Sequence, residues 1–259
     1  MVSAPSPALL ALVLCLSASA VHAQDKPPEK KDPPKVLMSL PLAISPGKLA
    51  QITLRGQRLD QATEVTMAGI DAAPKVEVKK KEKATVPNGL KAEEIGDSQV
   101  QIEFTLPNDF DKPEVQLVVA SADGTSQPYS MLVLPAEKLV AETEPNEAFR
   151  KPGSIALGQT TSGSVHQQRD VDVFKIEGVA GETIVAEIFA ARRGSALDPI
   201  MSLYDATGQL LVQSDDQPEH RDAILKHQLR AAGSYFLVLL DAHDRGSAAH
   251  PYLLQLRSE

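Results

Sequence analysis

From residue 36 onward, apolar and polar residues alternate over short segments, and turn residues separate these segments. In 49–55 (LAQITLR), Ala50, Ile52 and Leu54 fall on one face and more polar residues fall on the other. This two-residue period is typical of a half-buried strand, and Pro-Gly, Pro-Asn and Asp-Gly pairs mark the turns. The same pattern predicts further strands at 64–68, 100–106, 115–120 and 130–134.

A second series of short strands follows an acidic segment at 140–150. Within it, 235–240 is apolar on both faces, which indicates a central strand covered on both sides. We therefore expect an all-β protein with two β-sandwich domains, and the strand spacing of the second half favours a sandwich or jelly roll. The strands of the second series are expected at 171–176, 183–190, 200–205, 209–214, 223–229, 234–241 and 252–257.

Composition narrows the class of protein. The 259 residues are 42% apolar, which excludes wholesale disorder, and a single cysteine excludes a disulfide framework. The net charge of −8 argues against nucleic-acid binding, which needs a basic surface. Residues 139–259 hold 11 basic and 17 acidic side chains, so this half carries −6 of the total and invites a cation hypothesis.

Residues 1–23 have the pattern of a secretory signal peptide. An unbroken apolar run at 9–16 is followed by small residues that end at Ala23, where we expect cleavage. The alternative, a membrane anchor, needs about 20 apolar residues, and no later segment is long enough either. Cleavage would remove Cys15 and leave a cysteine-free chain, which suits a secreted, periplasmic or envelope location. Residues 24–35, rich in Pro and Lys, predict a solvated linker.

A strongly basic segment at 75–83 (KVEVKKKEK) interrupts the first series of strands. Such runs are usually solvated loops or edge strands guarded by lysines. An anion-binding patch is the functional alternative.

The first half, 36–135, resembles the immunoglobulin-like IPT/TIG domain. The resemblance rests on a proline-glycine entry (ISPG, 44–47), a strand that ends in glycine (QITLRG, 51–56), and a second strand that ends at Gly69. It implies an immunoglobulin-type β-sandwich for these residues.

Eight short motifs follow one another through the second half, 140–259: ETEPNE (142–147), GSV (163–165), DVDVF (170–174), AGE (180–182), GSALDP (194–199), LYD (203–205), DD (215–216) and AGSY (232–235). With these motifs the second half resembles the bacterial pre-peptidase C-terminal domain. The resemblance implies a jelly-roll sandwich at 151–259 behind an acidic hinge at 136–150. It also implies a domain of secreted bacterial proteins that often follows a protease and is not itself catalytic. Relatives in collagenases bind calcium at the entrance segment and recognise extracellular polymer.

Calcium binding is the most specific chemical hypothesis. A hard cation such as Ca²⁺ binds six to eight oxygen ligands, and the entrance segment and the acidic strand start offer several. Glu147 stands where the family more often has Asp, and Arg169 stands where some calcium-binding relatives have an acid. The alternative is that the entrance is a solvated linker and that Asp172 caps a turn. The candidate ligands are Glu142, Glu144, Asn146, Glu147, Asp170 and Asp172.

Other polar residues favour structural roles. The sequence holds no zinc-binding His-Glu-x-x-His, no Gly-x-Ser-x-Gly turn and no glycine-rich phosphate loop. The five histidines after residue 23 are scattered, and we expect them to be exposed. Asp198 and the Asp215–Asp216 pair are expected to close turns. With no Trp, and with three of four tyrosines inside strand patterns, stacking on sugars is disfavoured, whereas a protein ligand remains open.

We therefore expect an exported, monomeric, non-enzymatic protein for adhesion, binding or scaffolding. Its partner would be a protein or polymer of the envelope or exterior. Two alternatives remain: an accessory or propeptide-like regulator of a separate secreted hydrolase, and a hydrolase whose site is not recognised.

Overall fold

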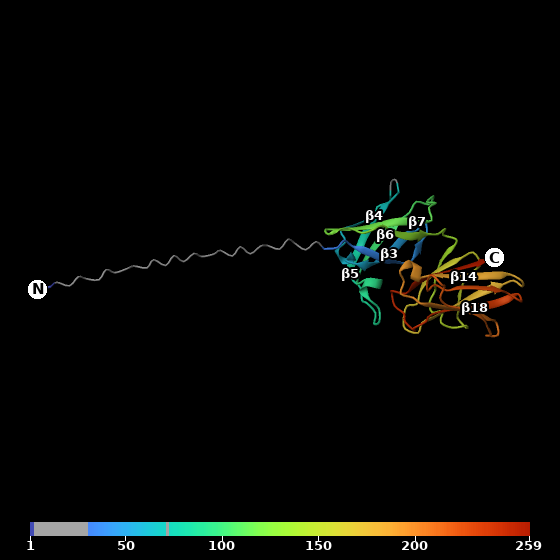
Figure 1. Ribbon diagram of the computed structural model, residues 1–259. Coiled ribbons are helices and arrows are strands. Elements are labelled where there is room, and N and C mark those ends of the chain that lie inside the picture. The colour runs from blue at the N-terminus through green and yellow to red at the C-terminus, as the bar shows by residue number, and fades with distance from the viewer. Residues whose placement is uncertain (3–30, 71–72) are drawn as a thin grey trace. The chain divides into compact units, whose positions relative to one another are not determined.

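The computed structural model describes residues 1–2, 31–70 and 73–259 (Figure 1). Residues Asp32–Glu259 form one compact unit, to which the following description is confined. The expected signal peptide, beyond its first two residues, and residues 24–30 of the expected linker lie outside the described residues. None of the helices within the described ranges is long and apolar enough to cross a bilayer.

The strands between residues 35 and 133 form two sheets, here called the N-terminal sandwich. One sheet has the order β1-β3-β6-β5, and the other has the order β2-β9-β7-β4 with β8 beside β7. The elements are β1 (Lys35–Leu40), β2 (Ala43–Ile44), β3 (Leu49–Gln57), η1 (Leu59–Gln61), β4 (Glu64–Ala68), β5 (Glu77–Lys83), α1 (Ala92–Ile95), β6 (Ser98–Thr105), β7 (Glu114–Ser121), β8 (Gly124–Thr125) and β9 (Tyr129–Val133).

The expected alternation builds the core of this sandwich. Every second residue of β6 is buried, and Ile102 belongs to the same apolar cluster as Ile52 of β3 and Leu117 of β7. Each fully buried aliphatic side chain of this kind contributes about 1.5–3 kcal/mol to folding. The basic segment is edge strand β5, which confirms the expected lysine-guarded edge.

The strands between residues 139 and 258 form two five-stranded sheets, the C-terminal sandwich. Their orders are β10-β12-β19-β14-β17 and β11-β13-β18-β15-β16. The elements are β10 (Leu139–Ala141), β11 (Gly153–Ser154), β12 (Thr160–Ser164), β13 (Val171–Gly178), β14 (Thr183–Phe189), η2 (Ala191–Arg193), β15 (Pro199–Asp205), β16 (Leu210–Ser214), β17 (Ile224–Gln228), β18 (Gly233–Asp241) and β19 (Pro251–Ser258).

Strand β18 occupies the middle of its sheet, as its two apolar faces predict. Leu237 and Leu239 enter the core, whereas Phe236 and Val238 alternate with them and face outward. The fold class, an all-β protein built of sandwiches, is therefore confirmed.

The segment expected as a hinge, 136–150, is partly built into the C-terminal sandwich. Its strand β10 pairs in parallel with β12, and Asn146 beyond it is fully buried. Backbone pairing and burial therefore hold part of the segment that was expected to be a hinge. Apolar clusters also join the two sandwiches: Met38 packs with Ala249, and Leu42 packs with Leu253.

Candidate cation site

Two segments distant in sequence bring acidic side chains together at one end of the C-terminal sandwich. Glu142 directly follows β10, and Glu144 and Asn146 lie on the loop beyond it. Asp170 precedes β13 by one residue, and Asp172 lies in β13. The main chain connects the two segments, because the Val173 amide donates to the Asn146 carbonyl at 3.1 Å.

Hydrogen bonds hold the entrance segment in place. The Asn146 side-chain amide donates to Glu142 Oε1 at 2.9 Å, and the Asn146 backbone amide donates to Glu144 Oε2 at 3.1 Å. The Ser164 amide of β12 donates to Glu142 Oε2 at 2.9 Å. The carboxylates of this segment are therefore oriented rather than free in solvent.

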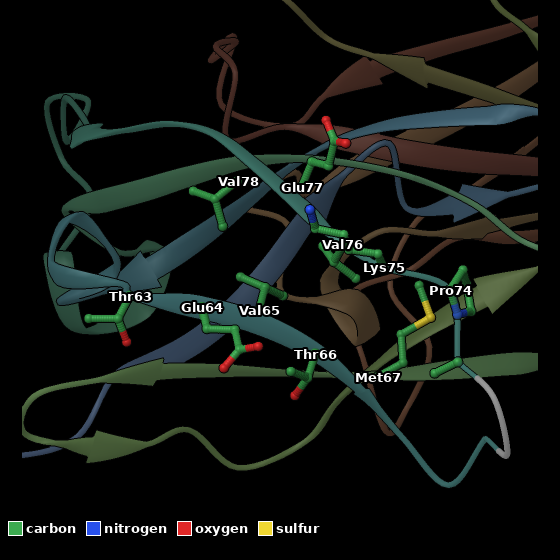
Figure 2. Close-up of a pocket in the computed structure, with 11 residues that line it drawn as sticks. Thr63, Glu64, Val65, Thr66, Met67, Pro74, Lys75, Val76, Glu77 and Val78 are labelled. Carbon is green, nitrogen blue, oxygen red and sulfur yellow. The ribbon is translucent and has the colours of Figure 1, made fainter.

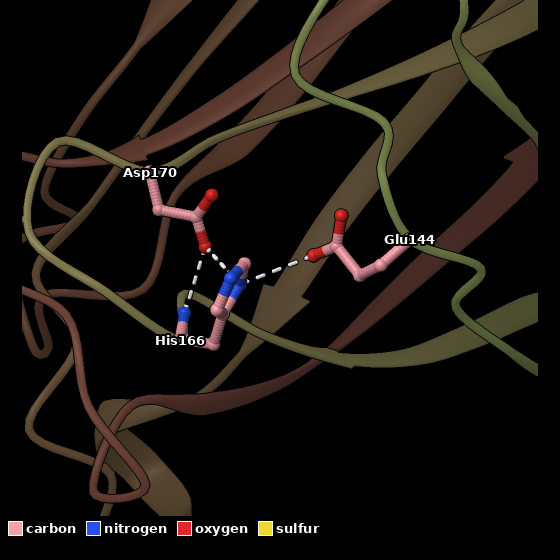
Figure 3. Close-up of side chains that lie close together, drawn as sticks. All are labelled: Glu144, His166 and Asp170. Carbon is pink, nitrogen blue, oxygen red and sulfur yellow. Dashed lines mark hydrogen bonds and ion pairs between the residues drawn. The ribbon is translucent and has the colours of Figure 1, made fainter.

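A histidine lies between Glu144 and Asp170, as Figure 3 shows. His166 Nδ1 is 3.2 Å from Glu144 Oε1 and 2.7 Å from Asp170 Oδ2, and the His166 amide also donates to Asp170 Oδ2 at 2.7 Å. The imidazole is about half exposed, whereas the Asp170 side chain is fully buried. His166 thus borders the acidic group on its solvent side.

Three buried oxygens of the site have no hydrogen-bond partner among the described residues. They are Asn146 Oδ1, Asp170 Oδ1 and Asp172 Oδ1. Buried polar atoms are almost always paired, and leaving one unpaired costs about 1–3 kcal/mol. Three unpaired acceptors in one small region are positions that a hydrogen-bond donor or a cation could occupy.

Electrostatics in the site point the same way. Burial raises the pKa of the Asp172 carboxyl to about 9, and the neighbouring Glu142 carboxylate adds to the rise. Burial and Glu142 also raise the pKa of Glu144. Without a cation, the Asp172 carboxyl would therefore keep its proton at neutral pH, because its ionised form would face the Glu142 charge in a poorly solvated place.

The donor set fits calcium. One ligand atom from each of Glu142, Glu144 and Asp172 lies within 4.8 Å of the others, and the same holds for Glu144, His166 and Asp170. Two ligands held 2.3–2.6 Å from one Ca²⁺ ion are at most about 5 Å apart, so this spacing suits a shared ion. Carboxylate and amide oxygens from a loop and a rigid strand are the ligands that Ca²⁺ prefers.

Of the six candidate ligands, the structure brings together five. Glu147 is exposed and, among the described residues, belongs to neither group. Arg169 is also exposed. Sequence analysis missed His166, and it missed Tyr252, whose hydroxyl contacts Glu142 and Asp172. Neither residue belongs to a motif that the sequence shows. Tyr252 in addition lies on β19, far along the chain from the acidic segments.

The expectation that the histidines are exposed is wrong for His250. This side chain is fully buried, and its Nδ1 lies 2.9 Å from the Ser247 hydroxyl. It lies directly before β19, whose first residues are buried, and the chain enters the core at this point.

Asp198, Asp215 and Asp216 form a second acidic group. The turn-closing role expected of Asp198 belongs to Asp241, whose carboxylate accepts from the amides of Asp198, His243 and Arg245. Asp198 itself lies 3.5 Å from His243 Nδ1 and 3.8 Å from Arg221, so its charge is partly compensated. This group therefore offers a weaker cation site than the first one.

A groove of about 890 Å³ lies in the N-terminal sandwich between edge strands β4 and β5 (Figure 2). Val65, Met67, Val76 and Val78 line it together with Thr, Glu and Lys side chains. Its lining residues hold no histidine or cysteine.

No family model matches this chain. A 97-residue stretch is 35% identical to a probable subtilase-type serine protease of Deinococcus radiodurans, and the match covers 36% of this chain and 13% of that protein. Because the match spans so little of the protease, it does not extend to the catalytic activity of that protein.

Matches to solved structures are weaker. One is the pre-peptidase C-terminal domain of a Bacillus anthracis collagenase, 15% identical with a TM-score of 0.34, which covers 45% of this chain and 100% of that domain. Another is SGBP-B of a Bacteroides ovatus mixed-linkage glucan locus, 12% identical with a TM-score of 0.27, which covers 87% of this chain and 74% of that protein. The chain is thus similar to a pre-peptidase C-terminal domain, whereas the IPT/TIG resemblance of its first half stays a prediction.

Proposed function

We propose that this chain is an exported, non-enzymatic binding module of the cell envelope or exterior, stabilised by calcium. The observation that carries the calcium site is the set of three buried, unpaired oxygens on Asn146, Asp170 and Asp172. Glu142 and Glu144 would complete the ligand set from the entrance segment.

A bound ion would act mainly on structure. Calcium would neutralise the carboxylates whose pKa values burial raises, and it would join the entrance segment to β13. The site lies at one end of the C-terminal sandwich. We expect the ion to stabilise this sandwich and not to take part in a reaction. Extracellular modules often bind calcium at 10⁻⁴–10⁻³ M, which agrees with the export that the leader sequence predicts.

The experiment compares thermal melts of the chain from residue 24 in EGTA, in 2 mM CaCl₂ and in 2 mM MgCl₂. A ligand that binds only the folded state stabilises it and raises the melting midpoint, and 2 mM calcium, at about 2–20 times such dissociation constants, would add about 0.7–1.8 kcal/mol. We expect a rise of several degrees with calcium and little with magnesium. Coincident melts in EGTA and calcium would remove the metal from this proposal.

A second candidate function has one supporting observation, the 97-residue match to a subtilase-type protease. In this case the chain would be an accessory or regulatory partner of a separate secreted protease. Immobilised chain, incubated with the extracellular fraction of the producing cell, should then retain proteolytic activity. A retained fraction without such activity would favour the binding module.

A further inference from the structure

The acidic end of the C-terminal sandwich offers two sets of metal ligands that differ in their chemistry. Glu142, Glu144 and Asp172 offer oxygen atoms only, whereas Glu144, His166 and Asp170 combine two carboxylates with an imidazole nitrogen. Only Glu144 belongs to both sets. Ca²⁺ takes oxygen ligands, whereas imidazole nitrogen together with carboxylate oxygen is typical of Zn²⁺ and related transition metals. The set that contains His166 therefore differs from a calcium site in its donor atoms.

The spacing within this second set is close to that of a zinc site. His166 Nδ1 lies 3.2 Å from Glu144 Oε1 and 2.7 Å from Asp170 Oδ2 (Figure 3). Two ligands of a tetrahedral zinc ion are about 3.3–3.6 Å apart, given Zn–N and Zn–O distances of about 2.0–2.2 Å. The Glu144 pair already has this spacing. The Asp170 pair stands at a hydrogen-bond distance, and an opening of about 0.6–0.9 Å would admit the ion.

Asp170 is a buried carboxylate without a full counter-charge. Its side chain is completely buried, its Oδ2 atom accepts from the His166 amide, and its Oδ1 atom has no hydrogen-bond partner. In the part of the chain that the structure describes, His166 is the one basic side chain that pairs with Asp170 or Glu144. Buried charges are almost always paired or bound to a metal. Asp170 therefore provides an oxygen that no other group of the site uses.

Glu144 and Asp170 can each serve two ions, because each carboxylate turns its two oxygens to different neighbours. Glu144 Oε1 faces His166, whereas Glu144 Oε2 accepts from the Asn146 amide of the entrance segment. Asp170 Oδ2 faces His166, which leaves Asp170 Oδ1 for the calcium ion of the proposed site. An ion at His166 would therefore lie beside the calcium ion without taking its ligands.

The charge of the region also leaves room for a second divalent ion. The four acidic groups Glu142, Glu144, Asp170 and Asp172 carry up to four negative charges, of which one Ca²⁺ ion compensates two. Arg169 precedes Asp170, but it is exposed and forms no ion pair with these four groups within the described ranges. Two divalent ions would balance the four carboxylates.

We infer that Glu144, His166 and Asp170 bind one zinc ion next to the proposed calcium ion. This inference rests on the proposed calcium-stabilised module and adds to it a second metal of a different class. Zinc would replace the proton between His166 Nδ1 and Asp170 Oδ2, and this proton would pass to solvent, since a ligating imidazole must be unprotonated. The half-exposed ring leaves the remaining coordination positions open to water. The ion would tie the turn before β13 to the entrance segment.

Isothermal titration calorimetry tests the inference. ZnCl₂ is titrated into the chain from residue 24, without a polyhistidine tag, in 2 mM CaCl₂. We expect one zinc ion per chain, and we expect Co²⁺ bound in its place to give visible absorption. His166→Gln should weaken zinc binding at least tenfold and remove the Co²⁺ absorption, yet keep the rise in melting temperature with calcium. Asp172→Asn, titrated without calcium, should still bind zinc, because Asp172 belongs only to the oxygen set.

His243→Gln is the matched control. The His243 ring is 53% exposed and its Nδ1 lies 3.5 Å from Asp198 Oδ2, so this residue also stands beside a carboxylate. This variant should bind zinc as the unmodified chain does, and thermal melts should show that all variants are folded. Unchanged zinc binding in His166→Gln would overturn the inference, as would zinc that binds only when calcium is absent. Loss of the calcium response in His166→Gln would also overturn it, by placing the histidine in the calcium shell.

The two proposals fail in different ways. A chain that calcium stabilises but that does not bind zinc in the presence of calcium keeps the proposed function and loses the second ion. A chain that binds zinc through His166 but that calcium does not stabilise keeps the zinc site and loses the calcium.

Discussion

The Tyr252 hydroxyl lies 2.6 Å from Glu142 Oε1 and 2.8 Å from Asp172 Oδ2, and it has one proton to donate. Two ionised carboxylates therefore cannot both be satisfied by this group. Either one carboxyl keeps a proton, or a cation compensates the second charge. Burial raises the pKa of Tyr252 well above its usual value, so ionisation of the phenol offers no relief.

Replacing Asp172, one of the two acids that contact the Tyr252 hydroxyl, distinguishes a protonated carboxyl from a bound cation. Asp172→Asn keeps the shape and removes one charge, so in EGTA the variant should be as stable as the unmodified chain, or more stable by about 1–2 kcal/mol. The same change should abolish the rise in melting temperature with calcium. Melts in EGTA and in calcium check both effects, and Glu147→Gln, at an exposed position, serves as the control. A full calcium response in Asp172→Asn would contradict the site.

A glycine beside the site gives a test that removes no ligand. A methyl group on Gly163 would lie 2.6 Å from the Tyr252 hydroxyl oxygen and still closer to Glu142 Oε2. Gly163→Ala should therefore displace Glu142, lower the stability by about 1–3 kcal/mol, and weaken calcium binding at least tenfold. Isothermal titration calorimetry measures the binding. Ser164→Ala should bind normally, since the Ser164 backbone amide still donates to Glu142.

His250 predicts a pH dependence separate from the cation site. Burial lowers the pKa of this ring, with contributions from Arg245 and Arg55, whereas Asp241 opposes the change. The unfolded chain then binds more protons than the folded one below about pH 6.5, so stability is lost as the pH falls through that value. His250→Gln should flatten the fall in unfolding free energy between pH 7 and 5, measured by urea denaturation. His243→Gln, at an exposed position, should leave the slope unchanged.

Asp222 is a fully buried carboxylate that the local structure satisfies completely. It accepts from the amides of Ala190, Ala191 and Arg192, and from Arg192 Nε at 2.7 Å. Asp222→Ala leaves these donors without their acceptor and should lower the unfolding free energy by about 3 kcal/mol. Glu187→Ala breaks only the outer ion pair of Arg192 and should cost less than about 1 kcal/mol. Equal losses in urea denaturation would mean that the buried bonds contribute little.

The strands predicted from the alternation agree with the structure to within about two residues. Thus 64–68 is β4, and 183–190 contains β14. The pattern failed for β2, β8, β10 and β11, which are two or three residues long. A period of two residues cannot be recognised in so short a segment, and such strands exist because a neighbouring strand pairs with them. It also missed β1, of six residues, and β12, of five.

The candidate cation site was only partly predictable. The acidic residues of 142–147 and 170–172 are visible in the sequence, and their family resemblance suggested calcium. The sequence did not show which of these residues converge. Asn146 is buried, whereas the neighbouring Glu147 is exposed. Contacts from β19 and from the His166 turn decided this.

Local alternation and composition along the chain were enough to establish the all-β class, the positions of most of the longer strands and the acidity of the second half. Tertiary structure alone decided which oxygens are buried without a partner, and that His166 lies between Glu144 and Asp170. Which residues of a strand are buried can be seen in the sequence itself, because apolar and polar residues alternate along the strand. A site, by contrast, forms where segments far apart in the chain are packed against each other, and the pairing of sheets sets that packing.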